Sequence, residues 1–340
     1  MRTSALYIFL SAILAFQSCE NKSSDEGDVK VIRGEAQGTT YSVKYHGENE
    51  VTKTEIDSIL REIDLSLSAW VEESVLNSFN LKDSLKINDS HFINVFYRSK
   101  EIAELTDGAF HPMVMPLVRA WGFGVGGGEL REDANLDSLK QLVNFNFEVE
   151  AIPNQNAVRI IKGGQKMDVN GIAQGYSVDV VGSYLEKQGV ENYMVEIGGE
   201  VLTSGESDKG EAWRIGVDKP LFGADQRELE AVISLNDAAL ATSGSYRKFY
   251  EKDGQRYSHT IDPSTGRPVE HNLLSATVRS SNCTDADALA TAFMVMGTEK
   301  AKEFLSKNPQ LNLDVFLIYD ENGELKTFMT EGFSKDLEEV

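Results

Sequence analysis

The stretch Asp168–Gly199, DVNGIAQGYSVDVVGSYLEKQGVENYMVEIGG, contains a predicted helix, strand and tight turn in direct succession. The helix is expected to run from just after Asn170 to about Gln188, and the strand over Tyr193–Ile197. Gly198-Gly199 then forms the turn. Along the whole chain, helices and strands follow each other in mixed order rather than in strict alternation. This order predicts an α+β fold with a largely antiparallel sheet.

Other segments extend this pattern in both directions. Thr52 and Glu55 have the spacing of a capping box, and an apolar stripe follows at Ile56, Ile59, Leu60, Ile63 and Leu67. Residues 112–128, rich in Pro and Gly, are expected to be a loop. Further helices are predicted over His91–Leu105, Asp137–Val143 and Thr284–Leu305. Further strands are predicted over Val29–Arg33, Thr40–Tyr45, Ala157–Ile161, Trp213–Val217, Glu230–Leu235, Tyr257–Ile261, Leu274–Arg279, Leu313–Tyr319 and Leu325–Met329, the first two around a Gly-Thr-Thr turn and the last two as a hairpin.

The N-terminus predicts export. Arg2 precedes the apolar run Ala5–Phe16, which is too short for a mature membrane span but suits a signal peptide. Cys19 follows that run as in a bacterial lipobox, although Gln17 is an imperfect residue for it. We therefore expect a signal peptide over residues 1–18, a lipid anchor on Cys19, a disordered tether over 19–29 and an enzyme domain over 30–340, all on the periplasmic side of a membrane. A plain cleaved signal peptide is the alternative.

Charge and cysteine content exclude some classes of partner and bond. The formal net charge of −21 argues against a nucleic-acid surface. A phosphate-containing ligand would need local positive potential from a metal ion, helix N-termini or backbone amides. Once Cys19 is acylated, Cys283 has no cysteine to pair with, so we expect it to be a buried, inert thiol.

One motif is misleading. Residues 122–127, GFGVGG, satisfy the G-x-G-x-x-G pattern of dinucleotide-binding folds. That pattern binds a dinucleotide only between a buried strand and the helix that follows it. No such βαβ unit surrounds these residues, so we expect a loop instead.

Asp287 and Thr291 lie four residues apart on a predicted helix, so their oxygens share one face. A carboxylate and a hydroxyl are the hard oxygen ligands that suit Mg²⁺. The competing interpretation is structural, because Thr284 and Asp287 also have capping-box spacing.

Two further segments carry polar groups. Asp168 leads through Asn170-Gly171 into a helix N-terminus, which can bind a phosphate or the N–H groups of a ring, or can be simple N-capping by Asn170. His259 is expected in a loop after a strand, where it is either a general base or a structural histidine. The hydroxyls of residues 242–246 have no acid–base neighbour that would make a serine nucleophile.

The order of these motifs closely resembles the ApbE family, the FAD:protein FMN transferases. The motifs that carry the resemblance are Gly38-Thr39-Thr40-Tyr41-Ser42, Ser68-Ala69-Trp70, Leu76-Asn77, Thr106-Asp107-Gly108-Ala109-Phe110-His111-Pro112, Trp121-Gly122-Phe123-Gly124, the Asp168 segment, Glu196-Ile197-Gly198-Gly199-Glu200, Ser243-Gly244-Ser245-Tyr246, and the His259 and Asp287 segments. The resemblance spans Val31 to Phe333. It implies a T-fold-like arrangement with two interleaved subdomains.

The resemblance also implies the chemistry: Mg²⁺-dependent transfer of the FMN half of FAD to a Thr or Ser of an acceptor protein, with release of AMP. The implied metal ligands are Asp287, Thr291 and the carbonyl of Gly171, and the implied catalytic residues are His259 and Asp287. The implied FAD-binding positions are Gln37, Trp70, Ala109, Phe110, His111, Asp168, Gln174, Thr260 and Ile261. Gln174 and Gln37 depart from the residues that many relatives carry there, which bears on FAD affinity and on the balance between transfer and hydrolysis.

Two other functions remain open: an FAD pyrophosphatase that uses water as the acceptor, and a flavin-binding lipoprotein without turnover. The expected partners are FAD, acceptor subunits of membrane-associated electron-transfer proteins and, through the lipid on Cys19, the membrane itself.

Overall fold

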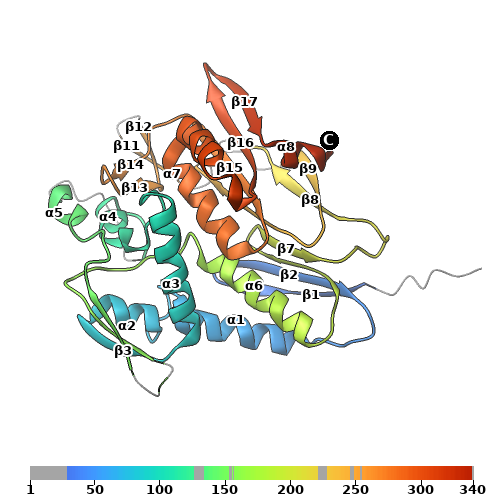
Figure 1. Ribbon diagram of the computed structural model, residues 1–340, viewed down its shortest axis with the longest axis horizontal. Coiled ribbons are helices and arrows are strands. Elements are labelled where there is room, and N and C mark those ends of the chain that lie inside the picture. The colour runs from blue at the N-terminus through green and yellow to red at the C-terminus, as the bar shows by residue number, and fades with distance from the viewer. Residues whose placement is uncertain are drawn as a thin grey trace, which may run out of the picture.

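The computed structural model describes residues 29–125, 134–152, 155, 157–220, 228–245, 249–252 and 255–338. Its centre is an eight-stranded sheet in the order β1-β2-β6-β7-β10-β15-β16-β17, and every pair of neighbours is antiparallel (Figure 1). These strands are β1 (Lys30–Ala36), β2 (Thr39–His46), β6 (Asn192–Ile197), β7 (Glu200–Ser204), β10 (Ala239–Gly244), β15 (Leu273–Ser280), β16 (Asp314–Glu321) and β17 (Glu324–Met329). The predicted α+β class with an antiparallel sheet is confirmed.

Four smaller sheets surround the large one in the described part of the chain. Two have three strands, in the orders β18-β9-β8 and β3-β5-β4, and two are the pairs β11-β12 and β13-β14. Their strands are β3 (Ser84–Ile87), β4 (Glu148–Ala151), β5 (Val158–Ile161), β8 (Trp213–Asp218), β9 (Leu229–Leu235), β11 (Phe249–Lys252), β12 (Gln255–Ser258), β13 (Ile261–Asp262), β14 (Arg267–Pro268) and β18 (Leu337–Glu338).

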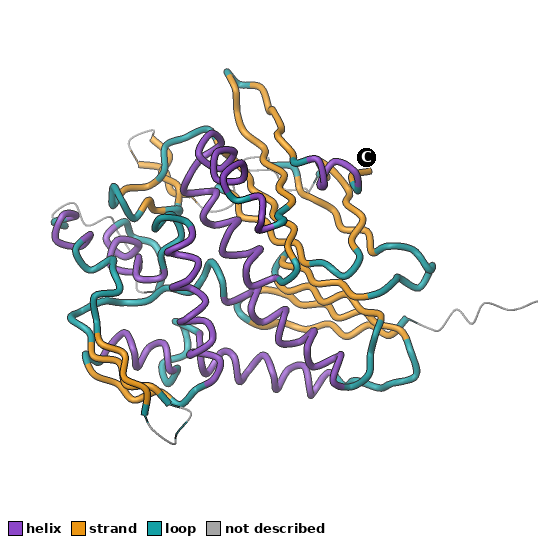
Figure 2. The backbone as a smooth tube through the Cα atoms, viewed as in Figure 1, coloured by secondary structure: helices purple, strands orange, loops and turns teal. Residues whose placement is uncertain are grey.

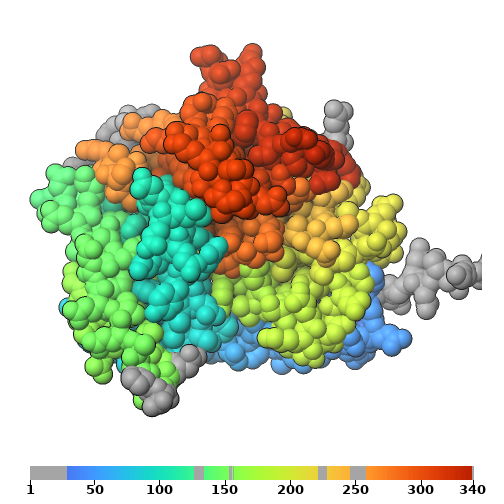
Figure 3. All heavy atoms as spheres, viewed as in Figure 1, coloured from blue at the N-terminus to red at the C-terminus, as the bar shows by residue number. Residues whose placement is uncertain are grey.

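Helices gather on one face of the large sheet, where α3, α6 and α7 lie side by side (Figures 1 and 2). Their side chains form a continuous cover in the space-filling view (Figure 3). The described helices are α1 (Lys53–Leu67), α2 (Val75–Leu81), α3 (Ser90–Leu105), α4 (Met115–Ala120), α5 (Leu136–Lys140), α6 (Ala173–Lys187), α7 (Cys283–Lys307), α8 (Glu331–Lys335) and the 3₁₀ turns η1 (Pro112–Val114) and η2 (Pro309–Leu311).

Side chains alternate between the two faces of the large sheet along its strands and so divide the core into two layers. On β16, Val315 and Leu317 point into the core beneath the helices, whereas Phe316 and Ile318 point to the opposite face. That opposite face is covered by β8 and β9 and by Phe333 of α8. The large sheet is therefore buried on both sides at this end, which accounts for its long apolar strands.

Local signals predicted several elements correctly. Thr52 and Glu55 form the expected capping box at the start of α1, and Ile56, Leu60 and Ile63 of its stripe are buried. The C-terminal hairpin pairs Glu321 with Glu324 across its turn, as predicted.

Other expectations were wrong. Residues 112–120 are not a loop but form η1 and α4, because proline is tolerated in the first turn of a helix and Leu117 and Ala120 are buried. The first hairpin turns at Gln37-Gly38, both with positive φ, while the two threonines belong to β2. The strand predicted over Tyr257–Ile261 is interrupted at residues 259–260. The elements α2, α8, η2, β3, β4, β7, β10, β11, β14 and β18 were not predicted.

The predicted signal peptide, Cys19 and all of the tether except Val29 lie outside the described residues. Within the described ranges, no helix has the length and apolar character needed to cross a bilayer. The helix α4, rather than a strand, precedes Gly122, which supports the rejection of a dinucleotide-binding motif there.

Candidate functional site

The centre of the candidate site is the place where α6 crosses α7. The backbone N–H of Gly175 donates to Oδ2 of Asp287 at 3.1 Å. A Cβ atom on Gly175 would lie 2.3 Å from the carbonyl oxygen of Cys283 and 2.8 Å from Cβ of Asp287. Only glycine allows this approach. Asp287 is 4% exposed, and burial, with a smaller contribution from the charge of Asp179, raises its pKa to about 7 against the opposing hydrogen bond from Gly175.

Thr291 lies one helical turn beyond Asp287 and faces the loop that precedes α6. A Cβ atom on Gly171 would lie 2.7 Å from Oγ1 of Thr291, so the backbone of Gly171 lies directly against that hydroxyl. Ser243, near the end of β10, places its Oγ 3.2 Å from Oγ1 of Thr291. The structure thus places Gly171 against Thr291, one helical turn from Asp287, and adds Ser243, whose contact with Thr291 was not predicted.

This cluster contains a single carboxylate. Among the described residues, no three His, Cys, Asp or Glu side chains come together as a metal-binding group. A site made of Asp287, Thr291 and a backbone carbonyl would leave most ligand positions to water or to phosphate oxygens. That composition suits Mg²⁺, which retains water and binds substrate phosphates.

The structural alternatives for these residues are wrong. The N-cap of α7 is Asn282, whose side chain accepts from the N–H of Asp285 at 2.8 Å, so Thr284 and Asp287 form no capping box. The N-cap of α6 is Ile172, without a side-chain cap. Asn170 instead donates its backbone N–H to Oδ1 of Asp168 at 2.9 Å, and Asp168 lies in a loop rather than at a strand end.

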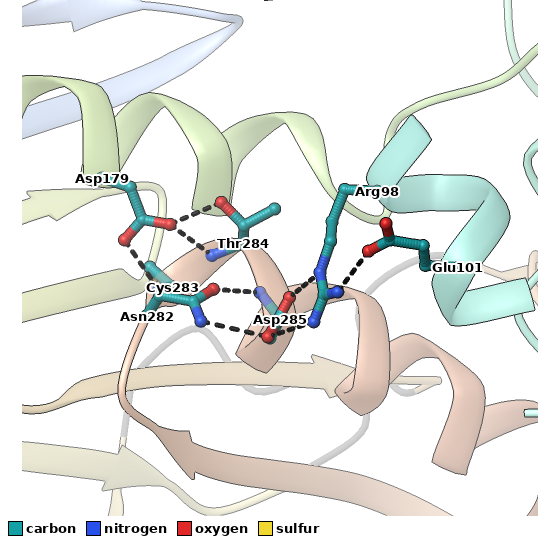
Figure 4. Close-up of polar contacts among 7 residues, drawn as sticks. All are labelled: Arg98, Glu101, Asp179, Asn282, Cys283, Thr284 and Asp285. Carbon is teal, nitrogen blue, oxygen red and sulfur yellow. Dashed lines mark hydrogen bonds and ion pairs between the residues drawn. The ribbon is translucent and has the colours of Figure 1, made fainter. Parts of the chain in front are cut away.

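A polar network fastens the first turn of α7 to its neighbours (Figure 4). Asp179 of α6 accepts from the backbone N–H groups of Cys283 and Thr284 at 2.7 and 2.8 Å, and also from the Thr284 hydroxyl. Arg98 of α3 holds Asp285 through two bonds of 2.6 Å. Asp179 and Arg98 therefore set the position of the helix that carries Asp287.

The sequence contained one signal for Asp179 that we missed. Gly175 and Asp179 are four residues apart, so both face α7 from the same side of α6. Burial raises the pKa of Asp179, while its bonds from Thr284 and Cys283 lower it. Burial likewise raises the pKa of the Cys283 thiol, and Cys283 is buried and free, as expected.

A second group of predicted residues adjoins the loop before α6. The backbone N–H of Asp168 donates to the carbonyl of Pro112 at 2.7 Å, which joins this loop to the Ala109–His111 segment. The His111 ring stacks on Phe145 at 4.8 Å between centroids, and burial lowers the pKa of His111 to about 4. Phe110 is 4% exposed, so its side chain belongs to the core.

Two turns of the large sheet approach the first turns of α6. Gln37 donates to Oγ of Ser177 at 2.6 Å, while its own Oε1 is buried and has no hydrogen-bond partner within the described residues. Nε2 of Gln174 lies 2.8 Å from the position that a Cβ on Gly198 would occupy. The two departures from the family pattern, Gln37 and Gln174, thus both lie against α6 or within it.

The remaining predicted residues lie on other segments. His259 is half-buried, and the centroid of its ring lies 6.4 Å from that of the Phe123 ring in an edge-on arrangement. Ile261 packs with Leu117 and Trp121, and the carbonyl of Thr260 accepts from Val269 at 3.0 Å. Trp70 follows α1 and is 73% exposed. An exposed tryptophan leaves a face open for stacking, whereas Ile261 can offer a ligand little beyond its backbone.

Comparisons with known proteins identify the family. The ApbE family model matches residues 37–316. An FAD:protein FMN transferase of Vibrio cholerae is 34% identical, with 96% of this chain and 97% of the relative covered. One from Escherichia coli K12 is 32% identical, with 96% of each covered. The solved structure of the flavin transferase ApbE from Vibrio cholerae matches with a TM-score of 0.78 and 34% sequence identity, covering 91% of this chain and 99% of its own. The crystal structure of the ApbE protein from Thermotoga maritima matches with a TM-score of 0.77 and 28% identity, covering 92% of this chain and 100% of its own. The chain belongs to the ApbE family.

Proposed function

We propose that this protein is an FAD:protein FMN transferase that uses Mg²⁺ to move the FMN half of FAD onto a Thr or Ser hydroxyl of an acceptor protein, releasing AMP. The observation that carries the proposal is the buried Asp287 carboxylate beside Thr291 and the backbone of Gly171. The full-length similarity to flavin transferases supports it.

The residues present fit a magnesium ion. Asp287 is almost fully buried yet receives only one protein hydrogen bond among the described residues, from Gly175. Burying a carboxylate is unfavourable unless a cation or further donors compensate. Held by Asp287, Thr291 and the Gly171 carbonyl, Mg²⁺ would supply positive charge to the pyrophosphate oxygens. In a chain with a net charge of −21, that local positive charge is needed for an anionic substrate.

The reaction is a displacement at phosphorus. The oxygen of the acceptor hydroxyl forms a bond to the FMN phosphorus, the bond from that phosphorus to the bridging oxygen breaks, and AMP leaves. The hydroxyl proton must be removed, and we assign this role to His259, because histidine is the side chain that most often acts as a general base. Positioning and charge stabilisation supply most of the catalysis in reactions of this class.

Other residues hold the substrate. We assign FAD contacts to Gln37, Trp70, Asp168 and Gln174 and to the segments Ala109–His111 and Thr260-Ile261. His111 is neutral at physiological pH because burial lowers its pKa, so it offers a ring face and a hydrogen bond rather than a charge.

We further propose that the enzyme acts on the periplasmic face of a membrane, anchored by a lipid on Cys19. A tether of about ten residues reaches at most roughly 35 Å when extended. Such a reach suits acceptors that are membrane-associated electron-transfer subunits.

One assay separates the proposed transfer from FAD hydrolysis and from flavin binding without turnover. The purified chain is incubated with FAD, Mg²⁺ and a candidate acceptor, and AMP and covalently bound flavin fluorescence are measured. Transfer yields both products, hydrolysis yields AMP alone, and binding without turnover yields neither. Asp287→Ala should abolish turnover without loss of the fold, whereas Glu299→Ala, an exposed change on the same helix, should not affect it. Wild-type activity of Asp287→Ala would refute the metal assignment.

A further inference from the structure

Arg119 of α4 is a half-buried arginine without a protein partner in the described part of the chain. Its Nε atom is buried and has no hydrogen bond, and none of the ion pairs within the described ranges includes its guanidinium. Buried donors without acceptors are rare in folded proteins because leaving them unpaired costs free energy. An acceptor from a bound molecule would remove that cost.

The segment that carries Arg119 is tied to the candidate site at both ends. Before α4, the carbonyl of Pro112 accepts from the N–H of Asp168 at 2.7 Å. After α4, Nε1 of Trp121 donates to the carbonyl of Gly266 at 2.7 Å, and Phe123 contacts the His259 ring edge-on. The segment that carries Arg119 is therefore joined to the Asp168 loop before α4 and to the segment of residues 259–266 after it.

Arg119 and Asp168 interact by charge without touching. Burial raises the pKa of Asp168, and both the hydrogen bond from Asn170 and the charge of Arg119 lower it. No ion pair or hydrogen bond joins the two side chains among the described residues, and only Oδ1 of Asp168 receives a bond, from Asn170. A guanidinium with free donors and a carboxylate with a free acceptor thus lie near each other.

This combination selects a particular ligand group. A phosphate near Arg119 would also face the negative charge of Asp168, and the Asp287–Thr291 cluster already offers a place for phosphates. A neutral group with an N–H next to a C=O satisfies both side chains at once, since the carboxylate accepts and the guanidinium donates. The pyrimidine ring of isoalloxazine has such an edge, in which an imide N–H lies between two carbonyls.

We propose that Arg119 and Asp168 bind the imide edge of the isoalloxazine ring of FAD, with Arg119 donating to a ring carbonyl and Asp168 accepting from the imide N–H. The proposal rests on FAD being the substrate, as proposed above. In this proposal Arg119 is a specificity-determining residue that recognises the isoalloxazine ring rather than the pyrophosphate.

Equilibrium binding of two substrate fragments tests this assignment without metal, acceptor or turnover. Riboflavin contains the ring but no phosphate or adenine, and AMP contains phosphate and adenine but no ring. Both are titrated into the wild-type protein, Arg119→Met and the control Arg214→Met, which removes an exposed arginine of β8. Because Arg119→Met lacks a charge-assisted hydrogen bond, its affinity for riboflavin should be about 10- to 100-fold lower than that of wild type. Its affinity for AMP should be unchanged, and the control variant should bind both fragments like wild type.

Weaker AMP binding, or unchanged binding of riboflavin by Arg119→Met, would overturn the proposal. A second measurement holds even if that variant folds poorly: wild-type protein should bind N3-methylriboflavin, which lacks the imide N–H, at least tenfold more weakly than riboflavin. Equal affinity for the two would also overturn it. Neither measurement involves AMP release, so the outcome of this binding test does not depend on whether the transferase assay succeeds.

Discussion

Replacing Gly175 by alanine should separate α6 from α7 at the candidate metal site. The added Cβ would lie 2.3 Å from the carbonyl oxygen of Cys283, whereas ordinary contacts of this kind are about 3.5 Å. The helices must therefore separate by roughly 1 Å, because the obstacle is backbone and cannot rotate away. That movement also lengthens the bond from Gly175 to Asp287.

The expected cost follows from these contacts. Overpacking costs about 1–3 kcal/mol, and a weakened hydrogen bond to a buried carboxylate adds about 1.5 kcal/mol or more. The higher helix propensity of alanine returns at most about 1 kcal/mol. We expect Gly175→Ala to lower the free energy of unfolding by about 2–4 kcal/mol and to weaken Mg²⁺ binding.

Gly182→Ala is the matched control on the same helix. There the added Cβ would meet the terminal Cδ2 of Leu202 at 2.5 Å and the hydroxyl of Tyr193 at 3.0 Å, which are the ends of side chains and not backbone. We expect a change within about 1 kcal/mol and unchanged Mg²⁺ binding. Urea unfolding with and without Mg²⁺ measures both quantities for each variant. Equal stability and equal Mg²⁺ affinity for Gly175→Ala and wild type would show that this crossing does not shape the site.

Further substitutions test other parts of the account. Asp179→Asn leaves at least one N–H of the first turn of α7 without its acceptor, so urea unfolding should show a loss of about 1–3 kcal/mol. An unchanged midpoint would contradict the stabilising role of Asp179. Asp287→Asn should lose the Mg²⁺-dependent rise in melting temperature, which for wild type corresponds to about 2.7 kcal/mol at 100 times Kd; a retained rise would place the ion elsewhere. Because burial lowers the pKa of His111, its contribution to the free energy of unfolding is complete above pH 6.5 and falls by up to about 3 kcal/mol as the pH drops towards 4. His111→Gln should lose that part of the pH dependence of stability. A stability profile identical to that of wild type would contradict this expectation.

Local signals were sufficient for elements whose stabilising contacts lie within the element. The cap and stripe of α1 predicted both its start and its buried face. Strand β7 pairs with β6 across the predicted Gly198-Gly199 turn, a local signal that we did not use. Strand β10 was missed because its pairing is non-local: residues 239–244 include small and polar side chains and become a strand by pairing with β15 and β7. Sequence patterns do not contain that information.

The candidate site shows the same division. The spacing of Asp287 and Thr291 predicted that both face one side of α7, since helix geometry alone determines this. The contacts of Thr291 with Gly171 and Ser243 depend on how three distant segments pack, so spacing could not predict them. Arg119 was missed for a similar reason, because its lack of a partner is visible only in the folded chain.

The most direct test of the central claim is the intact mass of an acceptor protein incubated with the chain, FAD and Mg²⁺, with AMP quantified in the same sample. The account predicts that the acceptor gains one FMN less one water and that one AMP appears for each acceptor labelled. Both products should disappear with Asp287→Asn or when a chelator removes Mg²⁺. Labelling that proceeds equally well without the Asp287 carboxylate, or AMP released without any labelled acceptor, would contradict it.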